Sequence, residues 1–318
     1  MGHRVQRKIP VVVQPCDIPE KQNSDQQLHL LAAASRVYSR AKALMAIQFI
    51  LTVPAALASS FLMALEPKAK LWLTFFSVTV ALTDVLFLSR IQSRLRKRGA
   101  TIQQMFDCGL FDLPWRQFRC GPPVDSEDIL AEAKPRLRKP KVRSRLVDWY
   151  PAAVKVLPLH LARLVCQRAS LSWDLRQRDR VRGALTLLLS LLVAAIFLIA
   201  LLRGNTVEQM ILTVYVPLAP AVLWIIREVF AQRDAIQSDE KSLVYVESLW
   251  NQALAKGVTE EELLQGSILA QDALFDARSR SPMVFNWVYR LLRSHHQEQM
   301  EHKAAEMVQE ALKRLGPS

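Results

Sequence analysis

Four stretches of the chain are almost entirely apolar over a length that suits a membrane-spanning helix. They cover residues 43–65, 71–89, 183–202 and 210–226, and the only charged residue within them is Asp84. A bilayer core of about 30 Å needs about 20 helical residues, because each residue adds 1.5 Å. The pattern therefore predicts four transmembrane helices. A buried helix of a water-soluble core is the alternative for each stretch, and it weighs most for the short fourth one.

The polar stretches show helical rather than strand periodicity. Residues 16–42 repeat apolar positions at helical spacing and lead directly into the first span. Three adjacent residues suit the start of that helix as caps: Asn23, Ser24 and Asp25. Pro158 is suited to open a helix that continues without a break into the third span.

Two further signals mark helix ends and loops. Thr259 and Glu262 have the spacing of a capping box and predict a helix start near the C-terminus. Two prolines in the basic tract 134–145 predict irregular structure there. The fold class is accordingly all-α, an integral membrane protein with two transmembrane hairpins and a helical cytosolic region. Its expected parts are an N-terminal segment (1–42), a first hairpin (43–89), a basic region (90–182), a second hairpin (183–226) and a C-terminal helical region (227–318).

Charge orients the spans. The chain has 42 Lys and Arg against 29 Asp and Glu, a net charge of +13. Residues 90–182 carry 21 basic and 9 acidic side chains, whereas residues 227–318 carry 11 basic and 14 acidic ones. Basic residues next to spans stay on the cytosolic side. Both termini and the region between the hairpins are therefore expected in the cytosol. Because topology explains much of the basic excess, no DNA or RNA partner is expected.

Motifs of catalysis and of metal binding are absent from the sequence. It has no Gly-x-Ser-x-Gly, no His-Glu-x-x-His and no phosphate-binding Gly-rich loop, so no catalytic residue is assigned and an enzyme is not expected. The four cysteines are widely spaced, which argues against disulfides and zinc. No metal site and no cofactor are expected.

Polar residues form a stripe along each of the first two spans. The first stripe is Gln48, Thr52, Ala55 and Ser59, and the second is Thr74, Ser77, Ala81 and Asp84. Such faces avoid lipid and either pack against helices or line water. A charge at the bilayer centre costs about 2.5–3.5 kcal/mol, so Asp84 faces the bundle interior, either paired with an arginine at the boundary or on a water-lined path.

Three prolines interrupt the hydrogen-bond ladder within spans: Pro54, Pro217 and Pro220. Such prolines act as hinges in some membrane helices and are ordinary kinks in others. Pro217 and Pro220, with the polar residues of the two stripes, are the candidate pore or gating residues.

Among the basic residues, Arg168 carries the most specific structural signal. It shares a helical face with several leucines, so it needs an anionic partner, either an aspartate such as Asp148 or Asp174 or a ligand phosphate. Three nearby aromatic residues suit base stacking, although such residues more often form core: Trp149, Tyr150 and Trp173. The basic tract 134–145 suits phosphates or anionic headgroups, with a solvated loop as the alternative.

Short motifs around the spans resemble a known family. In chain order they are Lys21-Gln22-Asn23, Gln104-Met105-Phe106-Asp107, Leu113-Pro114-Trp115, Asp148-Trp149-Tyr150-Pro151, Cys166-Gln167-Arg168, Trp173-Asp174-Leu175-Arg176, and Gln271-Asp272-Ala273-Leu274-Phe275 with Arg278. Over about residues 16–290 their order resembles the SMODS-associating four-transmembrane effectors, bacterial pore-forming effectors. Two residues depart from that pattern: Ala34 stands where Gln is expected, and Ser170 where Asn is expected.

The resemblance implies an effector of cyclic-oligonucleotide-based antiphage defence (CBASS). In that scheme a cyclic oligonucleotide made during infection activates the effector, which oligomerises or opens in the lipid bilayer and permeabilises the inner membrane, and the cell dies. A homo-oligomer is implied. The alternative is a non-conducting membrane scaffold that recruits cytosolic partners. Because cyclic oligonucleotides are anionic and carry bases, the expected ligand contacts are Arg36, Lys42, Trp149, Tyr150, Arg168, Trp173 and Arg176.

Overall fold

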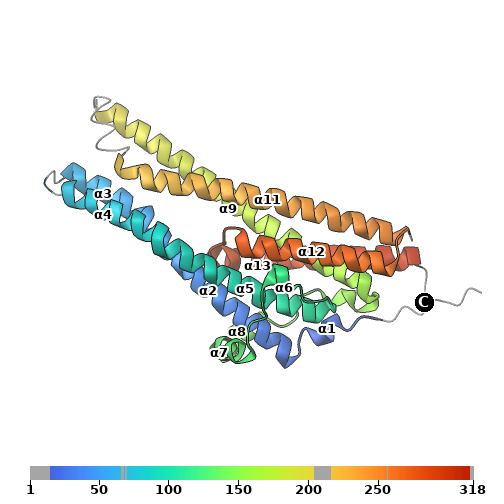
Figure 1. Ribbon diagram of the computed structural model, residues 1–318. Helices are drawn as coiled ribbons and strands as arrows, with labels where there is room; N and C mark the ends of the chain where they lie inside the picture. Colours follow the sequence, from blue (N-terminus) through green and yellow to red (C-terminus); the bar gives the residue numbers. More distant parts are fainter. Residues whose placement is uncertain (1–14, 66–67, 69, 204–215, 256, 316–318) are drawn as a thin grey trace, which may run out of the picture.

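The computed structural model describes residues 15–65, 68, 70–203, 216–255 and 257–315, and every regular element within these ranges is a helix. Figure 1 shows an elongated bundle in which the longest helices lie side by side along the molecular axis. The all-α prediction is confirmed for the described residues.

The first half of the chain forms a long antiparallel pair. Its elements are α1 (Ile18–Lys21), α2 (Asp25–Thr52), α3 (Pro54–Leu65), α4 (Lys70–Thr83), η2 (Asp84–Leu88) and α5 (Ser89–Phe111). Ser24 caps α2 by accepting from the Gln27 N–H, as its side chain predicts. The first span is divided at Val53, directly before Pro54, because proline cannot donate to the preceding turn. The second span continues into α5 through the single π-helical turn η2.

The basic region contains more helix than its prolines predict. Its elements are α6 (Gln117–Cys120), α7 (Ser126–Leu137), α8 (Pro140–Arg143) and the 3-10 helix η3 (Ala152–Val156). The prediction of irregular structure over 134–145 is wrong at both prolines. Pro135 lies inside α7 and deprives the Ala131 carbonyl of its helical donor, and the Arg36 guanidinium donates to that carbonyl instead (3.1 Å). Pro140 occupies the first position of α8, where no backbone donor is required.

The second half contains the longest helices: α9 (Leu159–Arg203), α11 (Val216–Leu254), α12 (Glu260–Arg280) and α13 (Asn286–Leu315). α9 begins directly after Pro158 and runs unbroken into the third span, as predicted. Thr259 and Glu262 form both bonds of the predicted capping box at the start of α12. α9 and α11 pack along their length, and α12 and α13 lie beside their polar ends (Figure 1).

Three described helices are long and apolar enough to cross a membrane: Asp25–Ser59, Leu71–Phe111 and Leu159–Leu198. The first six residues of the predicted fourth span, 210–215, lie outside the described residues. We call α3, α4 and η2, together with the ends of three long helices, the apolar section. These ends are α2 from residue 43, α9 from residue 183 and α11 up to residue 226. The remainder of the described chain is the polar body. In Figure 1 the apolar section occupies the end at upper left and the polar body the opposite end.

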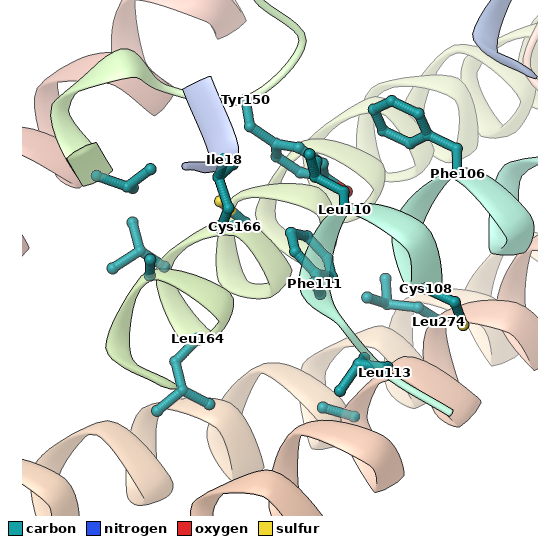
Figure 2. Close-up of a cluster of buried hydrophobic side chains, with 14 of the residues drawn as sticks. Ile18, Phe106, Cys108, Leu110, Phe111, Leu113, Tyr150, Leu164, Cys166 and Leu274 are labelled. Atoms are coloured by element: carbon teal, nitrogen blue, oxygen red, sulfur yellow. The ribbon is translucent and has the colours of Figure 1, made fainter. Parts of the chain in front are cut away.

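Each section has its own hydrophobic core. The larger core lies in the polar body and joins α1, α2, α5, α7, α9, α11, α12 and α13. Figure 2 shows part of it, where Phe106, Phe111 and Tyr150 pack beside Ile18 and Leu274. The smaller core lies in the apolar section and is built mainly from α3, α9 and α11.

Candidate functional site

A cavity of about 440 Å³ opens in the polar body. Its walls come mainly from α2, α9, α13, the segment 142–150 and the link 281–284 between α12 and α13, with single residues from α5, α7 and α12. This volume lies in the range of pockets that hold small molecules, about 300–1,000 Å³. We call it the polar-body cavity.

Basic side chains outnumber acidic ones on its lining. The basic residues are Lys42, Arg136, Arg145, Arg178 and Arg278, and the acidic ones are Asp148 and Asp174. Burial lowers the pKa of Lys42 to about 8, with the Asp174 charge opposing this shift and the Arg178 charge contributing to it. An anion within the cavity would stabilise the protonated form of Lys42.

Four aromatic side chains complete the lining: Tyr38, Trp149, Tyr150 and Trp173. They come from α2, from the segment before η3 and from α9. Trp149 and Trp173 are half-buried, so part of each indole is accessible. An accessible aromatic face is a surface on which a nucleobase can stack.

A buried hydrogen-bond network holds one wall of the cavity in place. Tyr150 donates its hydroxyl proton to one oxygen of Asp107 (2.8 Å), and Gln271 donates to the other (2.9 Å). Arg278 forms an ion pair with the same carboxylate. Burial and the charge of Asp107 raise the pKa of Tyr150, so its hydroxyl remains a donor. Tyr150 and Arg278 both line the cavity, and their positions are therefore set by Asp107.

Arg178 ties the cavity to two other elements. Its Nε donates to Asp239 of α11 (3.0 Å), and its Nη1 donates to the Pro282 carbonyl (2.8 Å). Both charged side chains are buried. Burial raises the pKa of Asp239 to about 7, although the Arg178 charge opposes the shift. One guanidinium thus faces the cavity and connects α9, α11 and the 281–284 link.

Four of the seven residues expected to contact a ligand line this cavity: Lys42, Trp149, Tyr150 and Trp173. They come from three separate segments, which meet only through the packing of α2 against the segment 142–150 and α9.

Arg36 and Arg176 lie outside the cavity and have protein partners. Arg36 pairs with Glu132 (3.2 Å) besides donating to the Ala131 carbonyl. Arg176 donates to the Gln299 side chain of α13. Both join helices of the polar body.

Arg168 also lies outside the cavity. It forms an ion pair with Glu247 of α11 (2.9 Å), rather than with the expected Asp148 or Asp174. Arg168 borders a void of about 10 Å³, which is at the lower limit for a single water molecule. Arg168 lies on the leucine-rich helical face that was predicted, but its partner depends on how α11 packs against α9.

Arg136 and Arg145 of the lining belong to the basic tract 134–145, which was expected to suit phosphates. Arg178, Arg278 and Tyr38 also line the cavity, but they were not among the expected ligand contacts. One local signal was available for Arg178, because Asp174 precedes it by one helical turn, a spacing at which opposite charges interact. The position of Arg178 shortly before the third span also fits a basic residue that orients that span. Arg278 and Tyr38 carry no local signal, because their surroundings are built from distant segments.

The two departures from the family pattern, Ala34 and Ser170, both line the polar-body cavity. Ser170 lies 3.2 Å from the Tyr150 hydroxyl. Both residues are smaller than the amides expected at these positions, so they leave more room in the cavity.

Asp84 marks a second polar site, within the apolar section. Its carboxylate accepts from Gln48 (2.5 Å) and Ser89 (3.4 Å) and lies 3.9 Å from the Arg227 guanidinium. It is the first residue of the π-helical turn η2, a distortion frequent at functional sites. A cavity of about 280 Å³, the span cavity, lies beside it.

The other candidate pore residues divide into two groups. Thr52, Ser77 and Pro220 line the span cavity with Asp84. Ser59 is buried and Thr74 is exposed, and neither lines that cavity. The side chain of Pro217 lies outside the described residues.

No cluster of metal-ligating side chains occurs among the described residues. The four cysteines are all free and buried. Burial raises the pKa of Cys108 to about 12 and that of Cys120 to about 11, so neither thiol forms a thiolate near neutral pH.

Comparison with known proteins identifies the family. The model of the SMODS-associating 4TM effector domain matches residues 16–307. A relative from Bacillus cereus (strain VD146), described as a probable CBASS effector molecule, is 21% identical over 294 residues, which cover 88% of this chain and 95% of the relative. No solved structure matches the chain. Since the matched region includes both sections of the molecule, the chain belongs to the SMODS-associating 4TM effector family.

Proposed function

We propose that this protein is a CBASS membrane effector that a cyclic oligonucleotide activates from the cytosol to permeabilise the bacterial inner membrane. It would cross the membrane four times in two hairpins, with both termini in the cytosol, and act as a homo-oligomer. The family and the description of the B. cereus relative support the antiphage role. No cofactor and no nucleic-acid partner form part of the proposal.

The observation that carries it is the continuity between the polar-body cavity and the apolar section. α2 and α9 each contribute cavity residues, and each then continues as one of the helices apolar enough to cross a membrane. A ligand in the cavity therefore touches the same helices that would lie in the bilayer.

The apolar section supports oligomerisation. Many of its large side chains are exposed, among them Trp72, Phe75 and Phe87 of the second span. A single chain leaves these faces open to lipid or to further copies, whereas the polar side chains beside Asp84 face inward. Several copies are needed to enclose an aqueous path, since four helices alone form a narrow bundle.

Vesicle leakage tests the proposal. The full chain is reconstituted into dye-loaded vesicles, and insertion is verified by protease protection. Cyclic dinucleotides and trinucleotides of different base composition are then added one at a time. We expect at least one of them to release the dye, while linear dinucleotides of the same bases do not. Absence of leakage with every ligand, in correctly inserted protein, contradicts the proposal.

A non-conducting scaffold is the second candidate. The contacts of Asp84 favour it, because Gln48, Ser89 and Arg227 already surround the carboxylate within one chain. A buried polar group satisfied in this way needs no water path. A scaffold would cause toxicity without loss of membrane potential, so a potential-sensitive dye in cells that express the protein separates the two functions.

A further inference from the structure

The polar-body cavity combines two chemistries. One is an excess of basic side chains, and the other is a set of accessible aromatic faces. Guanidinium groups suit phosphate because their planar fork donates two parallel hydrogen bonds, and an ammonium group suits it as a point charge. Aromatic faces suit bases. A ligand with both phosphodiester groups and bases matches the whole lining.

Two of the basic residues lie apart from the two accessible tryptophans, although Arg145 lies on the same segment as Trp149. Lys42 and Arg178 lie on α2 and α9 near the points where these helices enter the apolar section. Trp149 lies on the segment before η3, and Trp173 lies on α9 more than one turn before Arg178. This separation suits a ring whose phosphates and bases point in different directions.

We propose that the polar-body cavity is the site for the cyclic oligonucleotide, with phosphates at Lys42 and Arg178 and bases stacked on Trp149 and Trp173. The assignment rests on the proposed function, because that function supplies the class of ligand. It goes further by naming the site, which neither the family nor the relative assigns.

The site implies a route from ligand to membrane. A phosphate at Arg178 competes with the Asp239 carboxylate for one guanidinium, and Asp239 belongs to α11. Binding therefore weakens a buried connection between α9 and α11 close to the apolar section. A ligand shifts a conformational equilibrium only by its different affinity for the two states. Exchange of partners at Arg178 supplies such a difference.

Direct binding to the full chain tests the site. Isothermal titration measures the affinity of nanodisc-held protein for a panel of cyclic dinucleotides and trinucleotides. Lys42→Gln removes a phosphate contact and Trp173→Leu removes a stacking face. Each is expected to weaken binding by about tenfold or more, as for charge-assisted hydrogen bonds and base–aromatic stacking. Arg168→Gln is the control, since it removes a positive charge as Lys42→Gln does but lies outside the cavity, on the helix that carries Trp173. The affinity of this variant for the ligand should stay within about twofold of that of wild type.

A third variant changes the cavity without removing a charge or an aromatic ring. Ala34→Gln narrows the cavity from the α2 wall without removing a charge, and it introduces the residue expected from the family pattern. It should also weaken binding, and thermal unfolding shows whether each variant retains the fold.

The outcomes separate the site from the function. If wild type binds a cyclic oligonucleotide and the folded cavity variants bind it equally well, the site is wrong and the proposed function stands. If the Arg168→Gln control weakens binding as much as the cavity variants do, the effect is general electrostatics and the site is again wrong. If wild type binds no member of the panel, the proposed function itself is contradicted.

Discussion

The polar body and the apolar section are built on different principles. The polar body buries large aromatic side chains together with a connected set of polar groups around Asp107. The apolar section buries little of itself. Only 6% of the most apolar window in the Leu71–Phe111 helix is buried, against 17% in Leu159–Leu198 and 28% in Asp25–Ser59.

The two sections obtain their stability from different partners. In the polar body, the packing partners and hydrogen-bond partners come from the same chain. The apolar section leaves most of its surface to the surroundings, which for such apolar helices means lipid or further copies of the chain. Changes in the polar body should therefore alter folding and ligand binding, whereas changes in the apolar section should alter membrane behaviour.

The strongest test of this contrast is Asp107→Asn. The substitution keeps the side-chain shape but removes the negative charge that compensates the buried Arg278. Breaking a buried ion pair by removing one partner costs about 3–5 kcal/mol. We expect the free energy of unfolding of the detergent-solubilised chain, measured by chemical denaturation, to fall by that amount.

The control for this prediction is a surface pair. Glu306→Gln removes the exposed ion pair with Lys303 (3.0 Å) and should cost less than about 1 kcal/mol. Equal stability of Asp107→Asn and wild type would mean that the polar body does not depend on its buried network.

Some of this organisation could be predicted from the sequence and some could not. The spans follow from run length, and the starts of α2, α9 and α12 follow from local signals at Ser24, Pro158 and Thr259. Those features depend on residues within one or two helical turns.

The candidate site was only partly predictable. The network around Asp107 joins residues up to 171 positions apart, and the partner of Arg178 lies 61 positions away. Helix packing sets these pairings, and neither periodicity nor spacing reveals the angle or register at which two helices meet. The face of Arg168 could be predicted from periodicity, whereas its partner Glu247 could not.

A change at Asp84 tests the apolar section. Asp84→Leu removes the carboxylate from Gln48 and Arg227 and leaves the second span without a charged residue. If this group lines the path in the open oligomer, ligand-induced vesicle leakage should fall about tenfold or more, since polar side chains within spans mark ion pathways. The free energy of unfolding of the polar body should remain unchanged. Thr79→Val, on an exposed position of α4, is the control and should leak as wild type. Unchanged leakage in Asp84→Leu would remove Asp84 from the path.

The pH dependence of ligand affinity tests the polar-body cavity. The pKa of Lys42 is lowered to about 8 against an ordinary 10.5, so Lys42 loses its proton as the pH rises through 8. A phosphate favours the protonated form, and its binding takes up protons. Affinity measured by titration calorimetry should fall between pH 7 and 9, by at most about tenfold per pH unit above the pKa. Buffers of different ionisation enthalpy report the proton uptake. Lys42→Gln should remove the part of both effects that lies near pH 8 and leave the part due to Asp239. An equal pH dependence in Lys42→Gln and wild type would show that Lys42 does not contact the ligand.

The smallest expected effect lies at the junction of the two sections, where Asp239 holds Arg178. The pKa of Asp239 is raised from 3.8 to about 7, so the folded state retains this proton more strongly than the unfolded state between those values. The contribution of Asp239 to stability therefore falls as the pH rises through that window.

Protonation below pH 7 also removes the negative charge that competes with a ligand phosphate for Arg178. We expect Asp239→Asn to lower the ligand concentration for half-maximal leakage by about fivefold, equivalent to ~1 kcal/mol. The same shift should appear in wild type as the pH falls from 8 to 6, after correction with the mutant for the titration of Lys42. Asp234→Asn, at an exposed position on α11, is the matched control. An increase in the required ligand concentration in Asp239→Asn would mean that the Arg178–Asp239 ion pair keeps the cavity in its ligand-binding form. Breaking that ion pair would then not be the step that couples ligand binding to the apolar section.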